Sequence, residues 1–216
     1  MNSIYIENQL FAPLDTFKIA ISVKNIFLLQ YETYEKMSFR NRYLIAGANG
    51  VIGLSVPLQN GRFQRGTIRD VKISYDERWQ SLHWKAIESS YRKAPFWEYY
   101  AFDIEILLKE KNTFLFDFCF ATWQWAAKHL KINDKLTVLD EVPNEVTFSH
   151  SEWCRNKLLP KNYLQNPMGG GQVIYTQVFQ DRFGFLPGLS IIDFFMNVGP
   201  QAAQLLKEAS FTENEQ

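Results

Sequence analysis

The chain has 216 residues, 23 basic and 23 acidic residues, and 46% hydrophobic residues. This composition is typical of a globular protein and argues against wholesale disorder, while a net charge of zero argues against non-specific binding of nucleic acid. No apolar stretch is long enough to cross a membrane and no basic-then-apolar leader opens the chain, so we expect a cytoplasmic protein without a membrane span. Two cysteines, Cys119 and Cys154, are too few for a disulfide framework or a metal cluster, and no metal site is expected.

The first thirty residues have the pattern of a strand, a helix and a second strand. Ser3–Glu7 and Asn25–Gln30 are predicted strands, and residues 14–21 have a weak helical period between them. Such a βαβ unit implies a parallel pair of strands, whose ligand would lie beyond their carboxyl ends, near residues 7–9 and 30–36. The dinucleotide and triphosphate signatures are missing there, so no cofactor is expected.

A β-hairpin is predicted next, because Asn49-Gly50 separates two β-type runs, at 42–46 and 51–58. The segment just before it, residues 36–42, holds the densest cluster of cationic and amide donors in the chain. Arginine suits bidentate capture of phosphate or carboxylate, so this segment is a candidate anion site. A solvated loop face is the alternative.

The central segment, Ser74–Pro95, is predicted to be a helix that starts with a capping box formed by Ser74 and Glu77. His83 lies on the apolar stripe of this helix. Its imidazole is the best single candidate for acid–base chemistry, because its unperturbed pKa lies near working pH. A histidine in that position can equally be a hydrogen-bonded core residue.

The rest of the chain is predicted to be mainly helical. The segments expected are helices at 96–111 and from about 113 to 131, an irregular stretch at 136–150, a strand-like run at 173–179, a short helix after Leu189 with a second capping box formed by Ser190 and Asp193, and a last helix after Gly199-Pro200. No linker is evident, so residues 1–210 are expected to form a single domain and 211–216 a frayed tail. The mixture favours the α/β class, with a Rossmann-like βαβ start, a β-hairpin and a helical middle; α+β is the alternative.

Several segments resemble the WbqC-like protein family. They are Lys36-x-Ser-Phe-Arg-Asn-Arg42, Asn49-Gly50, Trp79-x-x-x-His83-Trp-Lys-x-Ile-Glu-x-x-Tyr91 and the closing run Phe183–Pro200. The resemblance implies a bacterial protein with a transferase-like role in the biosynthesis of O-antigen or another surface polysaccharide. Relatives often carry a His-Gln-Pro-like run, similar to the phosphate loop of nucleotidyltransferases, where this chain has Glu7-Asn8-Gln9. This departure argues against nucleotidyl transfer.

The leading hypothesis is therefore a transferase with a histidine general base, acting by acyl or aminoacyl transfer or on a nucleotide-activated donor. Its predicted site consists of His83 as base with Asp70 orienting the ring, and of Asn8, Lys36, Arg40, Asn41 and Arg42 as the residues that bind the phosphate or carboxylate of the substrate. The expected partner is a small anionic or nucleotide-activated substrate, and a homodimer is left open. The alternative is a non-catalytic binding or scaffold protein of the same pathway.

Overall fold

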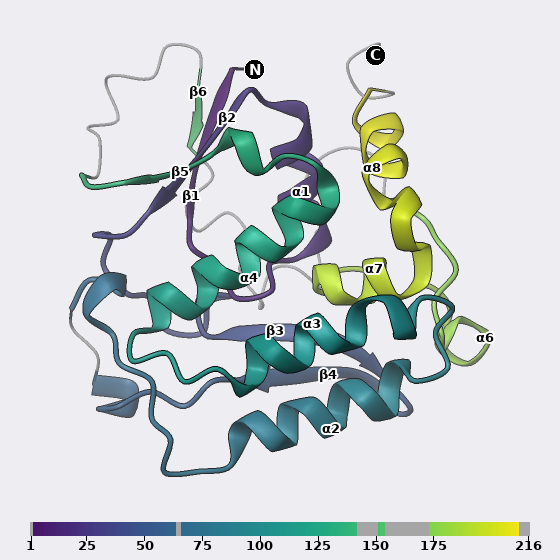
Figure 1. Cartoon of the computed structure of the whole chain (residues 1–216), viewed down its shortest axis with the longest axis horizontal. Coiled ribbons are helices and arrows are strands. Elements are labelled where there is room, and N and C mark those ends of the chain that lie inside the picture. Colours follow the sequence, from purple (N-terminus) through teal and green to yellow (C-terminus); the bar gives the residue numbers. More distant parts are fainter. Residues whose placement is uncertain (1, 64–65, 142–150, 154–172, 212–216) are drawn as a thin grey trace.

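A computed structural model describes residues 2–63, 66–141, 151–153 and 173–211 (Figure 1). Among these residues, four strands form one parallel sheet and two form a separate antiparallel hairpin. Helices pack around both, so the α/β class is confirmed.

The parallel sheet begins with the predicted βαβ unit. Strand β1 (Ser3–Glu7) is followed by helix α1 (Leu14–Ser22) and strand β2 (Asn25–Leu29), and the two strands pair in parallel, with Ser3 opposite Asn25. Residues on both faces of these strands are buried, apart from the partly buried Tyr5 and Phe27 and the exposed Asn25, which is why both strands read as apolar runs. The βαβ prediction is confirmed.

Two short strands complete the sheet in the order β5-β2-β1-β6. Strand β5 (Leu136–Leu139) pairs in parallel with β2, and β6 (Ser151–Trp153) pairs in parallel with β1. The sequence predicted no strand in the stretch that contains β5. Along the chain, β2 and then β5 are added on one side of β1, and β6 is added last on the other side of β1. The direction of winding therefore reverses between β1 and β6.

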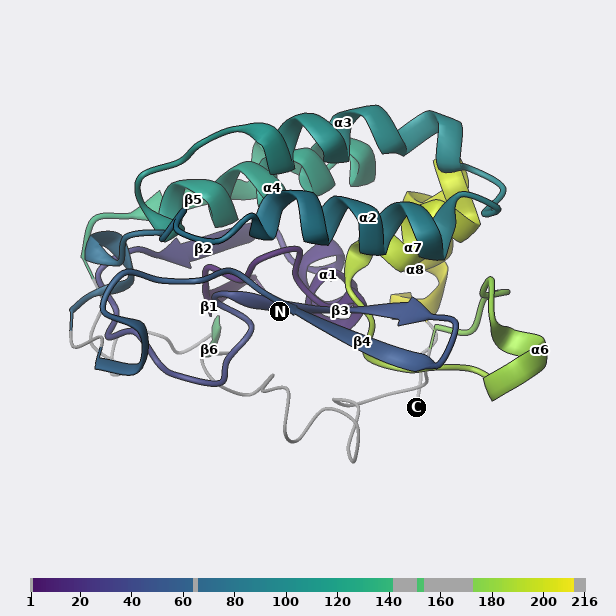
Figure 2. The same ribbon diagram turned by 90° about the horizontal axis from the view of Figure 1, so that it is seen from below.

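The hairpin consists of β3 (Arg42–Gly47) and β4 (Gly50–Ser55), joined at Ala48 and Asn49 as the Asn-Gly pair predicted. Helix α2 (Trp79–Tyr91) packs against β3, and the hydroxyl of Tyr91 accepts a hydrogen bond from the backbone N–H of Ala46 at 3.0 Å. Figure 2 shows α2 and the two helices that follow it, α3 (Trp97–Lys109) and α4 (Leu115–Leu130), on one side of the hairpin.

The predicted start of α2 at Ser74 is wrong. The hydroxyl of Ser74 donates to Oδ2 of Asp76 at 2.7 Å and its backbone carbonyl accepts from the indole of Trp79 at 3.0 Å, so both groups serve a local turn. The helix therefore begins at Trp79 without a side-chain cap. The two later helices begin and end within three residues of their expected bounds.

The C-terminal part folds back onto the start of the chain. It comprises α6 (Gln180–Phe183), α7 (Ile191–Val198) and α8 (Ala202–Phe211), and α8 packs against α1. The strand predicted at 173–179 does not form, although burial alternates from Val173 to Gln177 as in a strand. Among the described residues, no helix combines the length and the apolar character needed to cross a membrane.

Candidate functional site

The candidate site lies at the carboxyl end of β1, where the winding of the sheet reverses. In open parallel sheets, ligands bind in the crevice beyond such a reversal point, outside the carboxyl ends of the strands. Here β1 ends in Glu7, and Asn8 and Gln9 follow it. All three polar side chains are 0% exposed. Buried polar side chains need partners, so their contacts show which groups remain for a ligand.

A hydrogen-bonded chain joins this loop to α1. The side-chain amide of Gln9 donates to Oε1 of Glu7 at 3.0 Å, and the hydroxyl of Thr16 donates to Oε1 of Gln9 at 2.8 Å. Asn8 points the other way, because its Nδ2 donates to the carbonyl of Phe116 on α4 at 3.0 Å. Its Oδ1 is buried and has no hydrogen-bond partner among the described residues. This oxygen is therefore a candidate ligand acceptor.

The backbone of the same loop is strained at Phe11, which has a positive φ of 39° and no exposed surface. Its N–H donates to the hydroxyl of Thr122 at 3.1 Å, and the N–H of Leu10 donates to the carbonyl of Phe39 at 2.8 Å. Non-glycine residues are rarely held in this region, and such strain clusters at functional sites.

Two helices begin beside this loop. The N–H of Leu14, the first residue of α1, donates to the carbonyl of Leu189 at 3.1 Å, and the N–H of Ile191, the first residue of α7, donates to the carbonyl of Ala12 at 2.9 Å. Between them, Ser190 is 1% exposed, and its hydroxyl is buried without a hydrogen-bond partner among the described residues. The N-terminal ends of two helices and a buried hydroxyl thus meet at one place, and each helix holds a carboxylate, Asp15 or Asp193, in its first turn.

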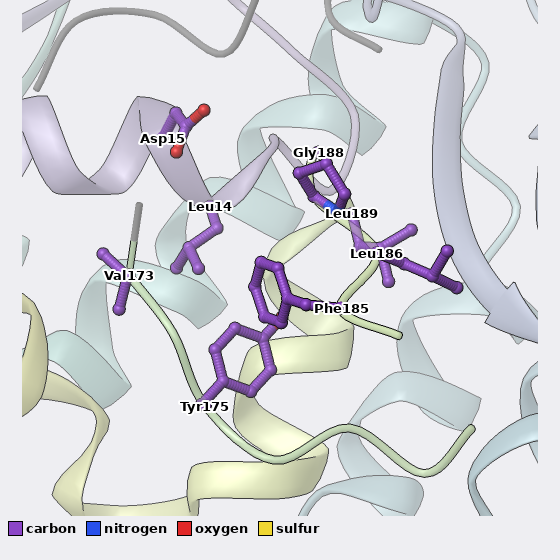
Figure 3. A pocket seen from close by; sticks show the side chains of 9 residues that line it. Leu14, Asp15, Val173, Tyr175, Phe185, Leu186, Gly188 and Leu189 are labelled. Carbon is purple, nitrogen blue, oxygen red and sulfur yellow. The ribbon is translucent and has the colours of Figure 1, made fainter. Parts of the chain in front are cut away.

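A small hollow of about 20 Å³ lies at this junction (Figure 3). The rings of Tyr175 and Phe185, with centroids 5.4 Å apart, form one wall, and Leu14 and Asp15 of α1 form part of another. The hollow has room for about one water-sized group, which is too small for a whole substrate.

The predicted anion-binding segment reaches the same edge, but the side chains of Arg40, Asn41 and Arg42 have partners within the chain. Arg40 is 0% exposed and holds Glu32 with two hydrogen bonds of 2.8 Å, from Nε and Nη2. Burial acts to lower the pKa of Arg40, but the hydrogen bonds to Glu32 and the negative charges of Glu32, Glu7 and Glu35 together raise it above its ordinary value. Asn41 donates to the carbonyl of Val56 and accepts from the hydroxyl of Tyr34, both at 3.0 Å.

The two remaining members of that segment point elsewhere. Nε of Arg42 donates to the hydroxyl of Ser55 across the hairpin at 2.9 Å. Lys36 is exposed and has no ion-pair partner among the described residues. Of the predicted substrate-binding residues, the structure therefore brings Asn8 and Arg40 to the carboxyl edge and places Arg42 on the hairpin.

The predicted catalytic pair is not brought together. His83 is buried, its Nδ1 lies 3.0 Å from the hydroxyl of Tyr43, and the ring of Trp79 packs on it with a centroid distance of 5.1 Å. Burial lowers the pKa of His83 to about 4, so the imidazole is neutral at pH 7. Asp70 is exposed and accepts from the hydroxyl of Thr67 at 2.6 Å.

The model of the WbqC-like protein family matches residues 9–182, which is most of the chain. The chain belongs to the WbqC-like protein family. Comparison with curated proteins and with solved structures finds no match. The matched range of this family member includes α1, the hairpin, α2 and the segment with Glu32 and Arg40.

A buried polar cluster around Asp193 was not predicted from the sequence. Asp193 is 0% exposed, and its Oδ2 accepts from the hydroxyl of Tyr175 at 2.6 Å and from Nε2 of Gln177 at 3.1 Å. Burial raises the pKa of Asp193 to about 6. The predicted capping box with Ser190 is wrong, because α7 has no side-chain cap and the carboxylate turns toward residues 175–177. The strand-like pattern of residues 173–179 was the available sequence signal, because Tyr175 and Gln177 fall on the same face of such a pattern.

Proposed function

We propose that this WbqC-like protein is a transferase in the biosynthesis of bacterial surface polysaccharide such as the O-antigen. In this proposal it binds an activated donor, bearing a phosphate or a carboxylate, beyond the carboxyl end of β1. The strand order carries the proposal, because it makes the end of β1 the reversal point of a parallel sheet.

The anionic group of the donor would lie where α1 and α7 begin. Positive partial charge at two helix N-termini favours an anion there. The hydroxyl of Ser190 would donate to that anion, and Oδ1 of Asn8, at the other end of the loop, would accept from a donor hydroxyl or amine. Lys36 remains a proposed contact from the exposed part of the neighbouring loop.

Arg40 and His83 take different roles in this proposal from those inferred first. The double hydrogen bond to Glu32 makes Arg40 a support for the loop beside the site. His83 would hold Tyr43, whose ring lies 5.0 Å from that of Phe11 in the site loop. A direct general-base role for His83, with or without Asp70, stays a prediction.

Thermal-shift measurements with nucleotide sugars, acyl-coenzyme A compounds and inorganic phosphate test the proposal. A donor at ten times its dissociation constant should raise the melting temperature by about 3–6 °C, since it adds about 1.4 kcal/mol of stability to a chain of this size. Ser190→Ala should reduce that shift without lowering the melting temperature of the free protein, because the hydroxyl has no internal partner among the described residues.

The matched control is Ser22→Ala, which removes an exposed hydroxyl that donates to the carbonyl of Ile19 at the C-terminal end of α1. It should bind the donor like the unmodified protein. Equal shifts for the Ser190 and Ser22 variants would refute the proposed anion position.

The alternative function, a non-catalytic binding or scaffold protein, is favoured by one observation. The histidine and the arginine that would perform chemistry are both buried and engaged by other residues of the chain. Stabilisation by a protein of the same pathway, with no activated donor producing a shift, would support this alternative over the transferase.

A further inference from the structure

A broad groove lies between the C-terminal half of α2 and the segment 176–181, apart from the site at the end of β1. It consists of two adjoining hollows of about 470 and 460 Å³ that share Lys93 and Val178. Each hollow is within the range of small-molecule sites. None of the residues of the β1 loop lines either hollow.

The first hollow is positively charged. Lys85, Arg92 and Lys93 line it, against the single carboxylate of Glu88. Arg92 lies 3.6 Å from Glu88, whereas Lys85 and Lys93 have no ion-pair partner among the described residues. The two lysines therefore remain for an anion, and phosphate oxygens are suitable acceptors for their ammonium groups.

The facing wall offers an apolar surface. Val178 and Phe179 line the first hollow and are partly buried against the hydrophobic core. The chain just before them is held firmly, because Oε1 of Gln177 accepts from the N–H of Leu186 at 2.8 Å and its Nε2 donates to the carbonyl of Leu186 at 2.9 Å. A wall fixed in this way loses little conformational freedom when a ligand binds.

Amide and hydroxyl groups line the second hollow. Thr176, Gln180 and Asn197 lie there with Asp181, and Nδ2 of Asn197 donates to the carbonyl of Asp193 at 2.7 Å. This end is therefore suited to hydroxyl groups such as those of a sugar, and the Asp181 carboxylate makes the lysine end the preferred place for phosphate.

We propose that this groove binds a nucleoside phosphate, with its phosphates between Lys85 and Lys93 and its ring against Val178 and Phe179. A ring and a phosphate on one ligand match the apolar wall and the two lysines that face it. The site does not depend on the proposed function, since it shares no residue with the carboxyl edge of the sheet.

Isothermal titration with uridine diphosphate, pyrophosphate and uridine tests this site. Uridine diphosphate should bind more tightly than either pyrophosphate or uridine alone. Lys85→Gln and Lys93→Gln should each lower the affinity for uridine diphosphate about three- to tenfold, as expected for the loss of one exposed charge-assisted contact. Phe179→Leu should weaken uridine diphosphate but leave pyrophosphate unchanged. Lys24→Gln, which removes an exposed lysine between α1 and β2, is the matched control and should bind like the unmodified protein.

Chemical acetylation followed by mass spectrometry locates the ligand. Uridine diphosphate should protect Lys85 and Lys93 from acetylation and should not protect Lys24. Ser190→Ala, which tests the carboxyl edge, should leave this protection intact, so failure of one site is distinguishable from failure of the other. Unchanged affinity in both lysine variants, or pyrophosphate binding as tightly as uridine diphosphate, would overturn the proposal.

Discussion

Tyr43 and His83 join the hairpin to α2 through a buried hydrogen bond, with the hydroxyl of Tyr43 3.0 Å from Nδ1 of His83. The imidazole also forms a hydrogen bond with the backbone of Ser55 on β4. A neutral imidazole has one donor and one acceptor nitrogen. Nε2–H therefore donates to the carbonyl of Ser55, and Nδ1 accepts from Tyr43.

The stability of the folded protein should depend on pH through the protonation of His83. The unfolded chain takes up this proton near pH 6.5 and the folded chain near pH 4. Between these values the unfolded state binds more protons, so the free energy of unfolding should fall by up to about 3 kcal/mol as the pH falls from 6.5 to 4. His83→Gln should lose this part of the slope in urea unfolding measured at several pH values.

Tyr43→Phe is the companion variant. It should cost about 1–2 kcal/mol at pH 7, because Nδ1 loses its partner, and it should keep the imidazole's pH slope. If the free energy of unfolding of His83→Gln changed with pH in parallel with that of the unmodified protein, the imidazole would be accessible to protons in the folded state.

Asp193 should give a slope of the opposite sign. Its pKa is raised from 3.8 to about 6 by burial, so the folded state binds more protons in this window. The free energy of unfolding should therefore fall by up to about 3 kcal/mol as the pH rises from 4 to 6. Asp193→Asn should remove this loss, since its amide oxygen can still accept from Tyr175 and Gln177. Melting temperatures from pH 4 to 8 check this, and identical pH profiles for the two proteins would contradict it.

Removing one partner of the buried pair of Glu32 and Arg40 should strongly destabilise the protein. Glu32→Gln leaves the guanidinium without its buried countercharge and should lower the free energy of unfolding by about 3–5 kcal/mol. Glu105→Gln is the control, because its ion pair with Lys109 is exposed and should contribute about 0.5 kcal/mol or less. Similar losses in urea unfolding for both variants would mean that the buried pair is not specifically required.

Gly199 should not tolerate a side chain. It ends α7 with a φ of +68°, and a Cβ there would lie 2.3 Å from Cδ1 of Phe96. Gly199→Ala should therefore destabilise the protein by about 3 kcal/mol or more, through strain and a clash with a packed ring. Gly50→Ala, at φ +107° with nothing within 4 Å of the added carbon, should cost about 1 kcal/mol. Thermal unfolding of the two variants compares them, and equal losses would contradict the role of Phe96.

The elements that sequence predicted well were those with a local signal. Alternation and apolar runs were enough for β1 and β2, and Asn49-Gly50 was enough for the hairpin. Strand β5 carried no such signal, because a four-residue strand is defined by the β2 edge on which it pairs. The capping boxes failed because Ser74 and Asp193 found other partners, one in a local turn and one in the segment 175–177.

The candidate site was predictable in place but not in detail. The βαβ pattern pointed to residues 7–9 at the carboxyl edge, since that rule depends only on topology. Nothing in the sequence indicated that Arg40 would be matched by Glu32, eight residues away across an irregular loop. The separate partners of His83 and Asp70 were equally hidden, because no helical or strand period relates the two residues.

The contact between Ala12–Leu14 and Leu189–Ile191 has a consequence for biosynthesis of the protein. The turn that follows the first strand finds its backbone partners about 175 residues later in the chain. During translation these backbone hydrogen bonds cannot form until almost the whole polypeptide has left the ribosome. We therefore expect nascent chains stopped before Leu189 to be sensitive to proteases and to depend on chaperones.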